Sequence, residues 1–309
     1  MASASSVTAS APGTVMLIGE HAVLHGRRAL VCAVDYRITV TLTPRADREL
    51  RMASELGRHQ TTLDNIQDTN AFRFVTGVFR ERGNDLGHGF DVRIDSDFSS
   101  TIGLGSSAAV TVASAMAIDG YLGTRPGEDE LHARCLRVIR DIQGRGSGAD
   151  LAASIQGGVI IYRATPYSSE SLGARPPLVL VYSGHKTPTP EVIRIVENNR
   201  AGDPARFDMI FDEMDHSIDT AAKAIRQENW KLFGRLLAEN QLRMEALGVH
   251  DEALDEIISG LRNAPGIYGA KISGSGLGDC VVAAGQGVSP DMPYPVIPVS
   301  VCQEGVRLE

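Results

Sequence analysis

One glycine-rich segment places two hydroxyl groups at a predicted junction between a loop and a helix. The segment GLGSSAAV, at residues 103–110, leads into an alanine-rich stretch with high helix propensity. Such a junction can bind an anion, because glycines let the backbone approach a ligand and the first N–H groups of a helix lack partners inside it. Ser106 and Ser107 could contact a phosphate or a metal ion. The pattern equally fits a serine N-cap with tight packing. It is not the P-loop, because no Lys follows the glycines.

A second glycine-rich segment, GRGSGADLAASIQGG at residues 144–158, carries a carboxylate at the start of a predicted helix or turn. This carboxylate is Asp150. On a tightly turned loop beside a phosphate site, a carboxylate can accept the proton of a hydroxyl group during phosphoryl transfer. The structural alternative is an ordinary helix N-cap, a common position for Asp.

Two further segments carry weight only in combination with the first two. KISGSGLGD, at residues 271–279, is a glycine loop between two predicted strands, and alone it fits a tight strand connection. SAPGTVMLIGEHAVLHG, at residues 10–26, combines a turn, a strand and the pair Glu20 and His21. The spacing of His21 and His25 could hold a metal on a helix, but this segment follows a strand and lacks the Glu of HExxH. The pattern therefore does not favour a metal pair.

Length, charge and cysteine spacing exclude several classes of protein. The 309 residues suffice for two domains or one large one. The net charge of −8 argues against nucleic acid as the main partner, because binding its phosphates requires a basic surface. No apolar stretch approaches the roughly 18 residues of a membrane span, and the first residues lack a signal-peptide pattern. We therefore expect a cytoplasmic protein with no membrane partner. The four cysteines show no CxxC spacing, which predicts free thiols.

The elements that must position these segments follow from hydrophobic periodicity. The first part is predicted to contain strands at 15–18, 29–42, about 90–98 and 159–163, and helices at 71–82, 106–122 and about 128–142. After a boundary at 166–177, we expect strands at 178–184, 269–273 and 279–285, helices from 188 and at about 203–226, 228–246 and 251–262, and a hairpin within 295–308. Strands, then helices, then strands are typical of an α+β fold. We predict two domains, residues 1–170 and 171–309.

The order and spacing of these segments resemble the GHMP kinases, a family that includes galactokinase, homoserine kinase, mevalonate kinase and phosphomevalonate kinase. The resemblance covers roughly residues 10–285, and GEHAVLHG with its preceding APG looks most like the mevalonate kinase branch. It implies a two-domain fold with ATP and acceptor bound in the cleft between the domains. It also implies Mg²⁺-dependent phosphorylation of a hydroxyl group of a small metabolite, with mevalonate to mevalonate 5-phosphate in isoprenoid precursor synthesis as the leading reaction. A homodimer is compatible with this resemblance.

The resemblance also assigns roles to residues by position. Asp150 would be the base that activates the acceptor hydroxyl, and Ser107 would help to hold Mg²⁺. Glu20, His21 and Thr189 would lie at the acceptor pocket. The ATP phosphates would be held by two glycine-rich loops, whose matching residues are Gly103, Leu104, Gly105, Ser106, Ser107, Ala108, Ser273, Gly274 and Gly276.

The sequence departs from the family pattern at two charged positions. The family usually places a Lys beside the catalytic Asp, at the position that Thr14 occupies here. Arg145 and Lys186 are candidates for a replacement cation, and we assign Arg145 a catalytic role; Arg145→Ala should then lower turnover far more than substrate affinity. The Mg²⁺-binding Glu of the family falls at Ile139. Asp141 is the nearest carboxylate and our candidate metal ligand, although two residues rotate a helical side chain by about 200°.

Asp279 and the segment after Asp150 leave other acceptors open. Phosphomevalonate kinases often carry an Asp at the position of Asp279, and their SGxD loop also runs into small and apolar residues, as it does at 151–153. Phosphomevalonate is therefore the first alternative, followed by homoserine, a sugar or another hydroxyl of mevalonate. An alternative of another class is an ATP-binding metabolite sensor with weak or no kinase activity. The retained Asp150 argues against a sensor, because pure binding does not require that carboxylate.

Overall fold

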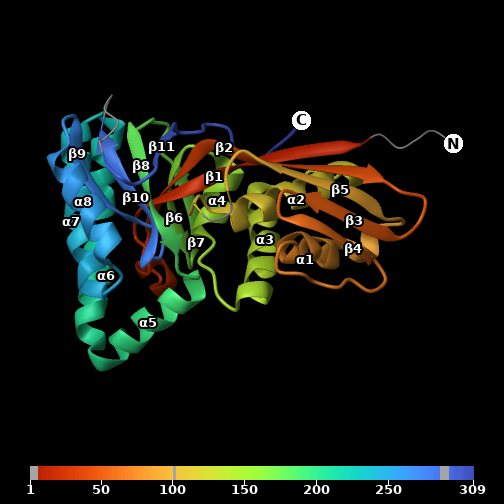
Figure 1. The fold of residues 1–309 in the computed structure, drawn as a ribbon, viewed down its shortest axis with the longest axis horizontal. Helices are drawn as coiled ribbons and strands as arrows, with labels where there is room; N and C mark the ends of the chain where they lie inside the picture. The colour runs from red at the N-terminus through yellow and green to blue at the C-terminus, as the bar shows by residue number, and fades with distance from the viewer. Residues whose placement is uncertain (1–5, 100–101, 286–291) are drawn as a thin grey trace.

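Two β-sheets with helices packed against them form the protein, seen in a computed structural model that describes residues 6–99, 102–285 and 292–309 (Figure 1). The larger sheet has the strand order β12-β1-β2-β5-β3-β4, and β6 joins it by pairing with β2 and β7. Its strands are β1 (Val7–Ile18), β2 (Ala29–Pro44), β3 (Glu49–Ser54), β4 (Gly57–Thr62), β5 (Phe90–Ser96), β6 (Val159–Ala164), β7 (Tyr167–Ser171) and β12 (Arg307–Leu308). Only β3 and β5 pair in parallel among these neighbours.

Four helices stack on the larger sheet. They are α1 (Arg73–Arg82), α2 (Ser106–Leu122), α3 (Glu128–Gln143) and α4 (Ala149–Gln156), and single turns lie at η1 (Ala22–His25) and η2 (Gly83–Asp85). Helices α2 and α4 pack on β1 and β2, and α1 and α3 pack against α2. The central helix α2 is buried because its alanines permit close contact with the sheet on one side and with helices on the other. Its N-terminus is therefore rigidly placed.

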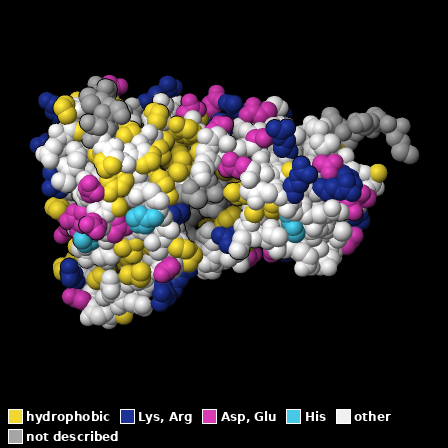
Figure 2. Space-filling model, viewed as in Figure 1, with side chains coloured by type: hydrophobic (Ala, Val, Ile, Leu, Met, Phe, Trp, Pro, Cys, Tyr) yellow, Lys and Arg dark blue, Asp and Glu magenta, His cyan; other side chains and the backbone are white. Residues whose placement is uncertain are grey.

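The second sheet has the order β11-β8-β10-β9, and its strands are β8 (Leu178–Lys186), β9 (Ile267–Ser273), β10 (Gly278–Gly285) and β11 (Val296–Val299). Four helices follow β8, namely α5 (Thr189–Gly202), α6 (Pro204–Arg226), α7 (Trp230–Leu247) and α8 (Glu252–Asn263). Helices α7 and α8 cover this sheet, and Figure 1 shows them at the opposite end of the molecule from α1. On the face drawn in Figure 2, hydrophobic side chains gather over the part that contains β8 and β11, and charged side chains are dispersed elsewhere.

The mixed α and β architecture confirms the predicted fold class, and the helices predicted at 106–122, 128–142 and 251–262 form within a residue or two of those bounds. The predicted C-terminal hairpin is wrong: β11 pairs with β8 in the small sheet, whereas β12 pairs with β1 in the large one. Strands β3, β4 and β7 were not predicted. The division at residue 170 stays a prediction. None of the helices in the described ranges is long and apolar enough to cross a membrane.

Candidate active site

A cavity of about 200 Å³ brings together residues from all four segments singled out in the sequence. Its walls come from β1 and the turn after it, the loop before α2, the loop before α4, the end of β8, the start of α5 and the loop between β9 and β10. The predicted site residues that line it are Glu20, His21, Gly103, Gly105, Ser106, Ser107, Ala108, Arg145, Asp150, Thr189, Ser273 and Gly274.

Asp150 and Thr14 both line the cavity and contact each other. The Thr14 hydroxyl donates a hydrogen bond of 2.8 Å to Oδ1 of Asp150. Asp150 is the second residue of α4, and Gly148 is the N-cap, so the alternative of Asp150 as a plain helix cap is wrong. A carboxylate in the first turn of a helix is stabilised by the helix dipole. Thr14 is 1% exposed and its N–H donates to the Leu104 carbonyl at 3.0 Å, so the position that is usually Lys in the family here joins Asp150 to the first loop.

Burial raises the pKa of the Asp150 carboxyl above its ordinary value, and the neighbouring Glu20 charge acts in the same direction. The Thr14 hydrogen bond and the positive charge of Lys186 oppose that rise in pKa. A carboxyl whose pKa approaches the working pH is a better general base, because its proton affinity better matches the task. The environment of Asp150 therefore suits proton removal from a hydroxyl group.

The first glycine-rich loop ends in an N-terminus built for an anion. Gly105, with φ at 63°, is the N-cap of α2, so the alternative of a serine N-cap is wrong. Ser106 and Ser107 are the first two helical residues, and both line the cavity. Their backbone N–H groups precede the first intrahelical bond, from the Ala109 N–H to the Gly105 carbonyl at 3.0 Å. Backbone donors, hydroxyl groups and the helix dipole thus converge on one point.

Two glycines of this loop are required by polar side chains that approach them. A Cβ at Gly105 would clash with the Thr14 hydroxyl, and a Cβ at Gly103 would clash with the Asp279 carboxylate. Asp279 itself has φ at 73°, an uncommon conformation for a residue other than Gly. Its carboxylate is 3.1 Å from the Lys186 Nζ. Burial raises the pKa of Asp279, and Lys186 opposes that rise.

Glu20 and His21 also line the cavity, and each contacts the third loop or the strand before it. The Lys271 ammonium, fully buried on β9, donates a hydrogen bond to Oε1 of Glu20 and another to the Ile272 carbonyl. His21 Nε2 donates to the Ser275 carbonyl at 2.9 Å. Burial lowers the pKa of His21, which keeps its imidazole neutral near pH 7. Oε2 of Glu20 and the Ser275 hydroxyl are buried without a hydrogen-bond partner among the described residues.

A second cavity of about 520 Å³ adjoins the first and shares six lining residues with it. The shared residues are Ser106, Ser107, Gln143, Lys186, Thr189 and Pro190. The remaining walls are more apolar and come chiefly from the region of α1, β5 and α2, with Phe74, Val75, Ile94 and Val110 among them. A flat apolar group attached to an anionic group could therefore occupy both cavities at once.

Some predicted site residues have other places. Asp141 is exposed and does not line the cavity, whereas Ile139, two residues earlier, does. Helical geometry accounts for this, since a two-residue step turns the side chain to the opposite side. Leu104 is buried behind the first loop, and Gly276 packs against Val249. Arg145 and Thr189 are exposed at the rim. No group of three or more His, Cys, Asp and Glu side chains that could hold a metal occurs in residues 6–99, 102–285 and 292–309.

Lys271 is the site component that the sequence did not reveal. It begins the third segment, yet its pairing with Glu20 depends on contact between residues 251 positions apart. The sequence offered one signal for this role, the scarcity of Lys, since the chain contains only four. Two of them, Lys186 and Lys271, lie beside carboxylates of the site.

Comparison with known proteins matches three segments of the chain to described families. Residues 70–158 match the GHMP kinases N terminal domain, residues 221–287 the GHMP kinases C terminal, and residues 2–44 the galactokinase galactose-binding signature. These matches include the first two glycine-rich loops, the third loop and the GEHAV segment.

Relatives and solved structures agree over nearly the whole length. A mevalonate kinase of Methanothermobacter thermautotrophicus is 30% identical over 285 residues, which is 92% of each chain. The crystal structure of the Methanococcus jannaschii mevalonate kinase has a TM-score of 0.80 at 23% identity and covers 96% of this chain and 98% of its own. A Streptococcus pneumoniae phosphomevalonate kinase, solved with phosphomevalonate and AMPPNP, has a TM-score of 0.78 at 15% identity over 91% and 92%. The two solved structures, at 23% and 15% identity, show that the chain shares their fold.

Proposed function

We propose that this chain, which belongs to the GHMP kinase family, transfers the terminal phosphoryl group of ATP to the 5-hydroxyl of mevalonate. The observation that carries the proposal is the position of Asp150. Its carboxylate lies in one cavity with the N-terminus of α2 and with Glu20 and His21. A base between an anion site and a polar acceptor pocket is the arrangement that phosphoryl transfer to an alcohol requires. The 30% identity to a mevalonate kinase supports this acceptor.

ATP would lie across the two adjoining cavities. The triphosphate would be bound by the N-terminus of α2, with the hydroxyls of Ser106 and Ser107, and by the third loop at Gly274. The adenosine would occupy the larger cavity, whose apolar walls include Phe74 and Val110. The turn between the triphosphate and the adenosine would lie at Ser106 and Ser107, which line both cavities.

The donor set beside the triphosphate fits Mg²⁺, which prefers oxygen ligands and keeps several waters and phosphate oxygens in its shell. Ser107 would hold it, as the resemblance implies. The lack of a larger carboxylate cluster among the described residues agrees with an ion held mainly by phosphate and water. When bound, Mg²⁺ supplies positive charge that neutralises the transferring phosphoryl group. Asp141 is exposed away from the cavity, and we do not assign it to the ion.

The acceptor would lie on the Glu20 side of Asp150. Oε2 of Glu20 is a buried acceptor that can take a hydrogen bond from an alcohol, and the Ser275 hydroxyl can donate to a carboxylate. Neutral His21, fixed by the Ser275 carbonyl, shapes the wall between them. Asp150 would then remove the proton of the reacting hydroxyl as that oxygen attacks the terminal phosphorus atom, and ADP leaves.

The test is ADP release by the purified protein with ATP, Mg²⁺ and a panel of mevalonate, phosphomevalonate, homoserine and galactose. We expect the highest kcat/KM with mevalonate and loss of ADP release in Asp150→Asn. The matched control is Asp141→Asn, which alters an exposed carboxylate outside the cavity. ADP release that does not depend on an added acceptor would contradict the proposal. Equal rates of ADP release in the wild type and Asp150→Asn would also contradict it.

Phosphomevalonate is the second candidate acceptor, and Asp279 is the observation that favours it. The buried carboxylate lies against Gly103 in the phosphate loop, at the position where the sequence resembles phosphomevalonate kinases. The same panel separates the two acceptors, since a kcat/KM higher with phosphomevalonate than with mevalonate assigns the chain to the second. Binding of ATP without product from any acceptor would instead support the sensor alternative.

A further inference from the structure

Three carboxylates line the cavity, and Lys271 pairs with one of them, Glu20. The other two, Asp150 and Asp279, lie at the place proposed for the ATP phosphates. Two negative charges beside a triphosphate repel it unless a cation lies among them. The position that usually carries the family's Lys holds Thr14, which donates a hydrogen bond but no charge. Bound Mg²⁺ would offset part of this negative charge, and the cationic side chain that the family usually adds at residue 14 would have to come from another part of the chain.

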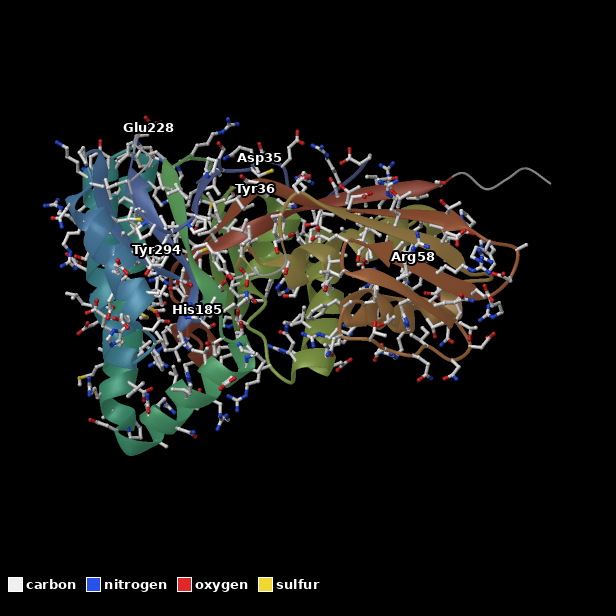
Figure 3. All side chains as sticks on the ribbon, viewed as in Figure 1. Asp35, Tyr36, Arg58, His185, Glu228 and Tyr294 are labelled. Atoms are coloured by element: carbon white, nitrogen blue, oxygen red, sulfur yellow. The ribbon has the colours of Figure 1, made fainter. Side chains whose placement is uncertain are left out.

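Lys186 meets the geometric requirement. Its Nζ lies 3.1 Å from Oδ2 and 3.4 Å from Oδ1 of Asp279, and the side chain lines both cavities. With one third of that side chain exposed, the ammonium stays accessible to a ligand. Lys186 is the last residue of β8, and Figure 3 labels its neighbour His185 at the lower end of that strand.

An irregularity in the small sheet explains why Lys186 and Asp279 meet. Strand β10 pairs Gly278 with Lys186 but Cys280 with Tyr182, so the register shifts between them. Such a bulge turns a side chain away from the regular alternation of a strand. Asp279 lies in the shift with φ at 73°, and its carboxylate is turned towards Gly103 and Lys186.

We infer that Lys186, held in place by Asp279, supplies the positive charge that faces Asp150 and the transferring phosphoryl group, so that β8 of the second sheet replaces the cation absent at residue 14. This inference rests on the proposed function. Lys186 would be the catalytic residue, because it would contact the transferring phosphate, and Asp279 would be a positioning residue. Arg145 is the competing candidate and also lines the first cavity, but it forms no ion pair with a described residue, whereas Asp279 holds Lys186.

The effect on Asp150 has a defined sign. The charged groups around Asp150 are Lys186, which lowers its pKa, and Glu20, which raises it, while Thr14 lowers it through a hydrogen bond. Asp279 pairs with Lys186 on the other side. Loss of the Lys186 charge should therefore raise the pKa of Asp150, and the acid limb of kcat/KM should move to higher pH.

The experiment compares Lys186→Met, Lys186→Arg and the control Lys223→Met, whose Lys is exposed on α6 outside both cavities. We expect kcat of Lys186→Met to fall about 100-fold, the size of effect typical for one preorganised charge-stabilising group. Its acid limb should shift to higher pH, and Lys186→Arg should retain the wild-type limb. A Lys186→Met variant with unchanged kcat and unchanged acid limb would overturn the inference.

Returning the charge to residue 14 is the sharper variant. Thr14→Lys combined with Lys186→Met should recover part of the lost kcat, because the new ammonium would lie beside Asp150 from the β1 side. The thermal unfolding of Thr14→Lys alone shows whether the fold tolerates this substitution. A tolerated Thr14→Lys that leaves the double variant as slow as Lys186→Met would count against a replaced charge.

Affinity measured without an acceptor separates failure of this inference from failure of the proposed function. Calorimetry of Lys186→Met should show about tenfold weaker binding of ATP. Binding of adenosine, which carries no phosphate, should be unchanged. If the wild type phosphorylates no acceptor, the proposed function is wrong. The affinities for ATP and for adenosine still test whether the Lys186 charge binds phosphate. Equal ATP affinity in wild type and Lys186→Met would overturn the charge role.

Discussion

Two ion pairs with a buried carboxylate differ in what surrounds them. Asp119 of α2 and Arg134 of α3 form paired hydrogen bonds of 3.1 and 3.0 Å, with side chains 0% and 7% exposed, within the helical layer. In the second pair, the single ammonium nitrogen of Lys186 lies 3.1 and 3.4 Å from the two carboxylate oxygens of Asp279, and a third of the Lys186 side chain is exposed. The first pair directs its charge inward, and the second leaves charge available to a ligand.

This difference teaches how to separate stabilising charge from functional charge. Breaking a fully enclosed pair leaves an unpaired charge in the core and costs stability. A cation that faces a cavity is also available to a ligand, so its removal costs ligand binding or catalysis, which the enclosed pair does not support. Variants on each side should therefore move different observables.

The largest expected effect is that of Asp150→Asn on turnover. Loss of the general base should lower kcat with mevalonate by about 10²–10⁴-fold. The Tm of this variant, in contrast, should not fall. The folded-state pKa of Asp150 is raised by burial, so stability falls as pH rises through its unfolded value and up to the folded one. At neutral pH the neutral Asn should give a Tm equal to or above that of the wild type. A Tm several degrees lower would show that the activity loss reports unfolding.

Arg134→Met tests the enclosed pair. It leaves the Asp119 carboxylate in the core with only the more distant Arg82 at 3.6 Å and the Thr124 hydroxyl. We expect a loss of about 3–5 kcal/mol in unfolding free energy. The kcat of the folded fraction should stay near the wild-type value, because neither partner lines the cavity. Unfolding followed by circular dichroism, with kcat measured at low temperature, checks both. A kcat reduced as strongly as that of Lys186→Met would erase the distinction between the pairs.

Thr14→Val should act on the pH profile. It removes the hydroxyl that donates to Asp150 while keeping the side-chain volume. Hydrogen bonds to charged groups contribute about 1.5–3 kcal/mol, so the acid limb should move up by about one pH unit or more. Thr14→Ser keeps the donor and should keep the limb. Identical limbs in wild type and Thr14→Val would mean that the hydroxyl does not control the Asp150 pKa.

Arg145→Ala should have the smallest effect. The Arg145 side chain is exposed where it lines the cavity, and we assign the charge at the proposed phosphate site to Lys186. Solvent screens an exposed charge, so we expect less than about a threefold change in kcat. Steady-state kinetics of Arg145→Ala and Lys186→Met, measured under the same conditions, show which of the two cations contributes more to kcat. A larger loss of kcat in Arg145→Ala than in Lys186→Met would transfer the role to Arg145, as the sequence first suggested.

The sequence predicted elements best where local chemistry defines both ends. Helix α2 has Gly105 and Gly123 as caps around an alanine-rich body, and its predicted and observed bounds coincide. Strands β3 and β4 escaped prediction because both are short: β4, at the sheet edge, is polar, and β3 alternates over only six residues, with Leu50 and Met52 buried. The C-terminal hairpin was wrong because adjacent strands can pair with different sheets, a choice that tertiary contacts make.

The candidate site divides along the same line. Most loop residues predicted to bind phosphate line the cavity, because glycine-rich sequences define their own turns. The pairings of Thr14 with Asp150, Glu20 with Lys271 and Lys186 with Asp279 span 136, 251 and 93 positions and depend on sheet register. Asp141 does not line the cavity for a local reason: it lies on the side of α3 opposite Ile139, and that side faces away from the cavity.

Phosphorus NMR of the product formed from ATP, Mg²⁺ and mevalonate tests the central claim most directly. Transfer to the primary 5-hydroxyl attaches phosphorus next to a CH₂ group, so the proton-coupled signal should be a triplet. The account predicts this triplet for the wild type and no new signal for Asp150→Asn. A singlet, as expected for the tertiary hydroxyl of mevalonate, would contradict the assigned acceptor atom. An unaltered triplet in Asp150→Asn would contradict the assigned base.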